Sequence, residues 1–312
     1  MRLLKAGPLP FIKKRNSANT LLYTMIAVLV GLITVGAIFA GVQVFLLAII
    51  SVASAMFFEL FYNFVVNERF KIENTSFIVT ALMFVCLCGA RTPLYVPVVA
   101  MFFAIVVVKM MFGGYANNMF NPAGASMLIV SAIFGASTNG WGTKIGSGYV
   151  ANVSERLASA NYAGFNPLNI LLNRISAPVG AVLLIAVLIG FALLVVFGVV
   201  KLRVPLIAIG TYVLMGFCLN DFSIVCLLPY LMNNMVIFVA CFMLVDYITS
   251  PNSLLGDIIY AVIFGVLCGV FVKFNLMGDL SAVVALVITN AFTPLLDRVI
   301  CPRYFGKGAK NE

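Results

Sequence analysis

Ten apolar runs, each close to the length of a membrane-spanning helix, make up most of this chain. They cover residues 20–40, 42–65, 76–90, 93–112, 122–137, 177–200, 204–219, 225–245, 257–273 and 279–296. A helix needs about 20 apolar residues to cross a bilayer, and 63% of the 312 residues are hydrophobic while only 9% are charged. A soluble domain carries about 25% charged residues. The pattern therefore predicts an all-α polytopic membrane protein with about ten transmembrane helices in contact with the lipid bilayer.

Two of these runs are too short for a full crossing. Residues 76–90 and 122–137 reach roughly 22–24 Å at about 1.5 Å per residue, less than a hydrocarbon core of about 30 Å. Irregular backbone is tolerated in a membrane only where protein surrounds it or where it lines a cavity. We expect both runs to be broken or half-spanning helices inside the bundle.

The basic residues predict the orientation, since cytoplasmic loops are enriched in Lys and Arg. With the N-terminus inside, fourteen of the 19 Lys and Arg residues, Lys109 among them, fall in or beside cytoplasmic loops. An even number of spans then places the C-terminus inside as well. These residues are dispersed over short loops, whereas a nucleic-acid surface gathers them on one face. The net charge of +9 is therefore interpreted as a topology signal, and no nucleic acid is expected as a partner.

One long polar stretch, residues 138–176, divides the chain. We predict an N-terminal five-helix repeat (1–137), an external polar loop (138–176) and a C-terminal five-helix repeat (177–312). An odd number of spans in each half inverts the second half relative to the first, as in known membrane proteins with ligand sites at their midplane.

Metal chemistry finds little support in the composition. The chain has no histidine, which excludes His-ligated haem, most catalytic zinc sites and a Ser-His-Asp triad within it. Its seven cysteines form no CxxC pair and are interpreted as small core residues, with an iron–sulfur ligand shared with another subunit as the alternative. We predict no metal site and no catalytic residue in this chain.

The turn between the fourth and fifth runs is the first candidate binding site. Gly113 and Gly114 permit a close approach of a ligand to the backbone. Asn118 and Asn121 offer amide donors and acceptors that suit a planar heterocycle with alternating carbonyl and N–H groups. The alternative is a well-capped tight turn, with Asn121 as the cap of the next helix and Pro122 in its first turn.

Two further polar clusters lie in or beside apolar runs. Asp246 and Thr249 follow the eighth run, and the alternative for this segment is a cap and turn. Thr80 belongs to a polar stretch that leads into the short third run. Both Asp246 and the first candidate site fall on the cytoplasmic side, so one composite site is expected.

Glu59 lies within the second run, about two turns from its cytoplasmic end. A carboxylate at that depth is a functional candidate by default, and we consider Glu59 and Asp246 as ion-coupling groups. The alternative for Glu59 is a structural partner, Arg69 or Lys71, near the membrane interface.

Together these segments resemble the D subunit of the Rnf ion-translocating electron-transport complex and the related B subunit of the sodium-pumping NADH:quinone reductase. The resemblance covers most of the chain. It is closest in the segments 73–82, 103–123 (GG-x-x-x-N-x-x-NP), 243–251 (D-x-x-T-S-P), 290–297 and 302–306.

The resemblance implies a membrane flavin-binding subunit that relays electrons between partner subunits of an Rnf-type oxidoreductase in a prokaryotic inner membrane. It implies a non-covalent flavin, riboflavin or FMN, near Asn118 and Asn121, with Thr80, Asp246 and Thr249 in motifs that line the same region. Fold class alone also permits a channel or transporter for a small polar solute, which is the alternative function.

The chain departs from this family at one position. Family members attach FMN covalently to a threonine in an S-x-A-T-type motif of the outer loop, and here Asn161 stands where that threonine would be. An amide cannot form the phosphoester, so we expect no covalent FMN on this chain.

Overall fold

A computed structural model describes residues 18–66, 75–114, 117–135, 153–160, 171 and 177–300. All regular secondary structure in these ranges is helical. The first half contains α1 (Ala18–Ala40), α2 (Gln43–Val66), α3 (Ser76–Leu87), α4 (Tyr95–Met101), which continues as the π-helix η1 (Phe102–Met110), and α5 (Pro122–Phe134).

The second half is more interrupted. It contains α6 (Val153–Ala158), η3 (Val179–Ala181), α8 (Leu184–Val196), α9 (Arg203–Leu219), η4 (Ile224–Cys226), α10 (Leu227–Leu231), α11 (Asn234–Phe238), η5 (Val239–Met243), α12 (Leu254–Lys273), η6 (Gly278–Leu280) and α13 (Ser281–Val299). Helical residues thus occur in each of the ten apolar runs.

Four helical stretches among the described residues are long and apolar enough to cross a membrane: 19–40, 43–66, 254–273 and 278–299. The number rises to five if Ile224–Leu231 and Asn234–Met243, which are bent by 53° at their break, form one span. These stretches fit an all-α membrane protein. Ten crossing helices, the inverted repeats and the division into two repeats and a loop go beyond this finding and stay predictions.

The two runs expected to be short are short helices. α3 has 12 residues and α5 has 13. Ten residues of α3 are buried, so this helix lies inside the bundle as expected. α5 begins at Pro122, directly after the turn that holds Asn118 and Asn121, and this places its N-terminus beside that candidate site.

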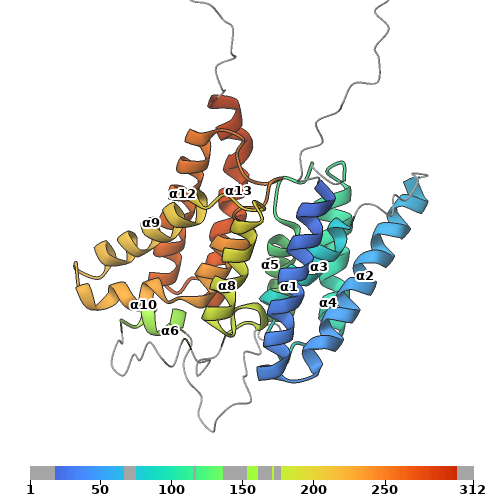
Figure 1. The fold of residues 1–312 in the computed structure, drawn as a ribbon, viewed down its shortest axis with the longest axis horizontal. Helices are drawn as coiled ribbons and strands as arrows, with labels where there is room; N and C mark the ends of the chain where they lie inside the picture. Colours follow the sequence, from blue (N-terminus) through green and yellow to red (C-terminus); the bar gives the residue numbers. More distant parts are fainter. Residues whose placement is uncertain are drawn as a thin grey trace, which may run out of the picture.

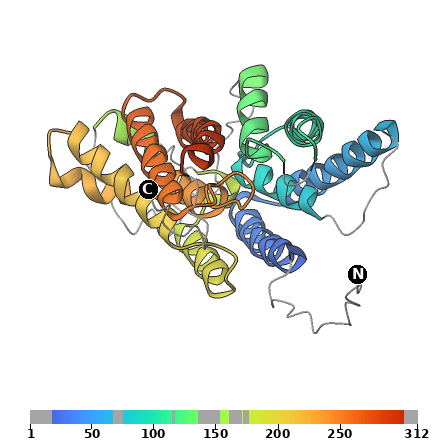
Figure 2. The ribbon, with the colours of Figure 1, turned by 90° about the horizontal axis from the view of Figure 1, so that it is seen from above.

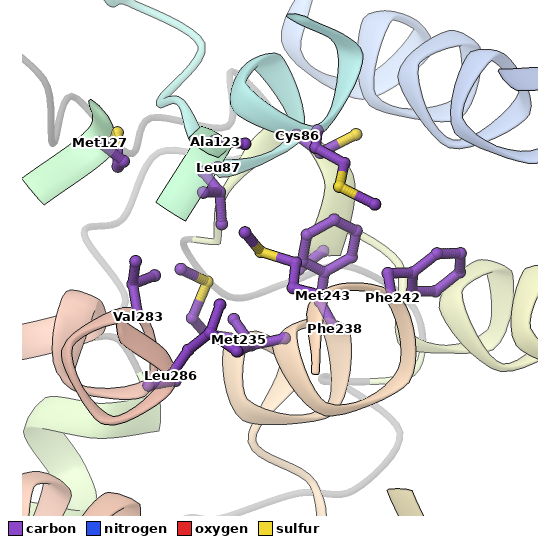
Figure 3. Close-up of a cluster of buried hydrophobic side chains, with 14 of the residues drawn as sticks. Cys86, Leu87, Ala123, Met127, Met235, Phe238, Phe242, Met243, Val283 and Leu286 are labelled. Carbon is purple, nitrogen blue, oxygen red and sulfur yellow. The ribbon is translucent and has the colours of Figure 1, made fainter. Parts of the chain in front are cut away.

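The helices form two neighbouring groups, α1–α5 and α8–α13 (Figures 1 and 2). The groups meet through contacts of α1 with α8 and η3, of α3 with η3, and of α5 with α13. Figure 3 shows the core at this junction, where Leu87 from the first group points toward Met235 and Met243 from the second. The beginning of α1 and the end of α13 lie at the same end of the bundle (Figure 1).

The outer surface of the bundle is apolar. α2 carries exposed phenylalanines at Phe57, Phe61 and Phe64, and Figure 2 shows this helix at the edge of the molecule. A soluble protein rarely exposes such a continuous apolar face, so this surface suits contact with lipid.

Candidate functional site

A cavity of about 220 Å³ lies where the two groups of helices meet. Its apolar walls come from the beginning of α1, from α3, from residues 199–200 after α8, and from η5 and the residues that follow it. Its polar lining residues are Ser76, Thr80, Lys109, Asn118, Asn121 and Asp246. Segments far apart in the sequence therefore contribute to one site, at the end of the bundle where α1 begins.

Asn121 serves both as a helix cap and as a cavity wall. Its Oδ1 accepts a hydrogen bond from the backbone N–H of Gly124 at 3.2 Å, which caps α5. Its Nδ2 is buried and has no hydrogen-bond partner among the described residues. A buried donor without an acceptor costs about 1–3 kcal/mol, so this amide group suits a bound acceptor. Capped turn and binding site, the two alternatives from the sequence, are thus compatible.

Asn118 is also buried and lines the cavity. Its Nδ2 donates to the carbonyl oxygen of Phe120 at 3.2 Å, which stabilises the turn before α5. The two asparagines expected to act together therefore reach the same cavity.

Gly113 and Gly114 are not brought to this cavity. Both have a positive φ, 104° and 83°, and they form the turn that follows η1. A side chain at Gly113 would come within 3.1 Å of Asn117 Nδ2. The structure thus gives these glycines a backbone role in shaping the loop, while their contact with a ligand stays a prediction.

Asp246 lines the cavity from the second group of helices, in the turn beyond the end of η5. Burial raises the pKa of its carboxyl group to about 6, and a hydrogen bond from the backbone N–H of Ile248 opposes that shift. The backbone N–H lies 3.4 Å from Asp246 Oδ1. A carboxyl with this pKa changes charge close to physiological pH.

The two threonines of the candidate set differ in position. Thr80 lines the cavity from α3, and its hydroxyl donates to the carbonyl oxygen of Ser76 at 3.2 Å. Thr249 is buried but does not line the cavity, and its carbonyl oxygen accepts from the hydroxyl of Thr293 at 2.7 Å. Thr249 therefore ties the 246–253 turn to α13.

Glu59 has a buried partner that the sequence did not suggest. Its Oε2 lies 2.8 Å from the Nζ of Lys109, and both side chains are almost fully buried. Among the described residues the partner of Glu59 is therefore Lys109, which the sequence had not suggested. The alternative partners, Arg69 and Lys71, lie outside the described residues. The available signal was a pair of opposite charges inside the second and fourth apolar runs, but they stand 50 positions apart.

Asp257 was not selected from the sequence. It lies in the first turn of α12, is fully buried, and forms ion pairs with Lys201 and Arg203. It does not line the cavity. A single acid just after a polar turn resembles an ordinary helix start, which is why the pattern did not distinguish it.

Other predicted features lie elsewhere. Asn161 is outside the described residues. Five of the six cysteines that the structure describes are buried and all six are free thiols, which fits small core residues. Cys218 is the exposed exception.

These features define a helical integral membrane protein with a partly polar cavity between two groups of helices. The family described as NQR2, RnfD, RnfE matches residues 6–306, and the chain belongs to this family. The resemblance seen in its motifs is therefore confirmed.

Individual relatives agree with this assignment. The chain is 24% identical to the D subunit of the Na(+)-translocating ferredoxin:NAD(+) oxidoreductase complex of Acetobacterium woodii, over 95% of this chain and 93% of that protein. It is 24% identical to the D subunit of the ion-translocating oxidoreductase complex of Methanosarcina acetivorans, over 100% of both chains. It is also 24% identical to the B subunit of the Na(+)-translocating NADH-quinone reductase of Klebsiella pneumoniae, over 73% of this chain and 60% of that protein.

Proposed function

We propose that this chain is a D-type membrane subunit of an ion-translocating oxidoreductase complex, where it binds a flavin without a covalent bond and relays electrons between partner subunits. Its relatives are named as subunits of such complexes. The observation that carries the proposal is Asn121, which lines the cavity and whose buried amide donor has no partner among the described residues. The solute channel considered from the sequence has no comparable support.

The residues around the cavity fit the ring system of a flavin. Asn121 Nδ2 can donate to a ring carbonyl, and the carboxylate of Asp246 can accept from a ring N–H. Phe242 and Val79 provide apolar walls for the aromatic rings. A bound flavin would supply the capacity to accept and pass on electrons, while the protein supplies position and electrostatics.

The remaining parts of the proposal come from the sequence. We place the protein in a prokaryotic inner membrane with both termini in the cytoplasm, and we expect riboflavin or FMN without the phosphoester, because Asn161 replaces the acceptor threonine. Asp246, at the cavity, and Glu59, behind Lys109, are the proposed ion-coupling groups.

The flavin content of the purified complex tests this function. We expect Asn121→Ala to lower the amount of flavin released by denaturation by about one molecule per complex and to slow electron transfer, because the buried donor is lost. Asn117→Ala is the matched control, since Asn117 belongs to the same loop but is exposed and does not line the cavity. A wild-type complex without flavin, or an Asn121→Ala complex with wild-type flavin content and electron transfer, would contradict the proposal. A fluorescent band for this chain on a denaturing gel would contradict the non-covalent binding.

A further inference from the structure

Lys109 is the one basic side chain among the described residues that line the cavity. It lies in the last turn of η1, is 2% exposed, and holds Glu59 at 2.8 Å. An ammonium group has three N–H donors, and the bond to Glu59 is the one hydrogen bond that Lys109 Nζ makes to the described residues. Two donors of a buried cation at the cavity wall thus have no partner among the described residues.

The geometry of the pair is asymmetric. Lys109 lines the cavity whereas Glu59 does not, so the carboxylate stands behind the ammonium group and binds it from the side of α2. The other charged residue of the lining is Asp246, on the second group of helices. One wall of the cavity therefore carries a fixed cation and another a carboxylate.

A cation in this position would interact more strongly with the reduced state of a bound flavin than with the oxidised state, because the two states differ in charge. Uptake of two electrons from the electron donor of the complex and one proton from water adds one negative charge to the cavity. At low local dielectric, a nearby fixed charge is felt far more strongly than in water, and charge close to the flavin ring is one of the means by which proteins adjust its electronic properties.

We propose that Lys109, held in place by Glu59, stabilises the additional negative charge of the reduced flavin and so raises its reduction potential. This inference rests on the proposed flavin site. It assigns to Lys109 an electrostatic role toward the flavin in addition to its contact with Glu59, and it makes Glu59 the group that holds the ammonium in place.

A redox titration of the purified complex tests this role without an activity assay. The flavin signal of this site is obtained by subtracting the spectrum of the Asn121→Ala complex from that of each other complex. In Lys109→Met the cation is replaced by an apolar side chain of similar length, and we expect the equilibrium constant for two-electron reduction to fall at least tenfold. That change corresponds to about 30 mV for a two-electron couple.

Two further variants separate the charge from its effect on folding. Glu59→Gln/Lys109→Met removes both charges and leaves no unpaired buried ion. Its potential should still be lowered, but by less than in Lys109→Met, because the Glu59 carboxylate no longer opposes reduction. Lys109→Arg keeps the charge and should return the potential toward the wild-type value. Lys273→Met is the control. Lys273 lies at the end of α12, donates to Asn220 and does not line the cavity.

Each outcome has a defined meaning. A lowered potential in both Met variants with recovery in Lys109→Arg supports the proposal. Unchanged potentials at full flavin content would overturn it. Loss of the flavin from the double variant would also overturn the proposal. Lys109 would then be needed to hold the oxidised flavin as well, and it would not favour the reduced form. Absence of flavin from the wild-type complex would instead refute the proposed function.

Discussion

Asn121 shows how one residue can serve the fold and the site together. Its Oδ1 caps α5, while the same side chain lines the cavity and has a buried Nδ2 without a partner among the described residues. An alanine would lose the cap, worth about 1 kcal/mol, as well as the donor. Measuring both the flavin content and the stability of the Asn121→Ala protein therefore separates the two roles.

The raised pKa of Asp246 makes the stability of the folded protein depend on pH. Burial raises the pKa of its carboxyl group from 3.8 to about 6, so the folded protein binds this proton more tightly than the unfolded chain. Its contribution to stability is present below pH 4 and is lost as the pH rises through 6. We expect Asp246→Asn to raise the thermal midpoint of the purified complex at pH 8 and to change it little at pH 4. An equal effect at both values would be evidence against a raised pKa.

At the scale of elements, the Glu59–Lys109 pair joins α2 to η1. Removal of one member of a buried pair leaves an uncompensated charge, at a cost of about 3–5 kcal/mol. We expect Glu59→Gln and Lys109→Met each to destabilise the protein, and the double variant to be clearly more stable than the sum of the two predicts. Titration with a denaturing detergent measures the stability of the wild type, the two single variants and the double variant. Additive effects of the two substitutions would show that the pair does not interact.

The contact between α9 and α12 depends on a missing side chain. A Cβ at Gly265 would clash with Thr211 and come within 2.7 Å of the backbone oxygen of Ala208. Because backbone cannot move aside easily, we expect Gly265→Ala to cost about 1–3 kcal/mol. Gly210→Ala in α9 is the matched control, since nothing lies within 4 Å of its added Cβ. Similar unfolding midpoints for the two variants would disprove this close packing.

At the scale of the whole molecule, the two groups of helices enclose the cavity jointly, and its residues come from both. Separation of the groups would open the cavity, so binding of any ligand there is coupled to their packing. The same end of the bundle holds the beginning of α1 and the end of α13 (Figure 1), which suits termini on one side of the membrane.

Membrane orientation can be tested at the two ends of α12. In a chain with Cys218→Ser and Cys301→Ser, we expect a membrane-impermeant maleimide to label Asn275→Cys from outside intact cells. Asn252→Cys, before the start of α12, should be labelled only after permeabilisation, because the basic residues place this end inside. The reverse labelling would overturn the orientation, and labelling of both from one side would show that α12 does not span.

The amino-acid sequence by itself determined the class of protein, the short helices α3 and α5, and four cavity-lining residues: Thr80, Asn118, Asn121 and Asp246. These follow from hydrophobicity, helix capping and the cost of polar groups in lipid, which act over a few neighbouring residues. Only the tertiary structure decided that Glu59 pairs with Lys109, that Asp257 binds Lys201 and Arg203, and that Gly113 and Gly114 do not line the cavity. Charge partners are chosen by the packing of distant helices, and no local pattern contains that information.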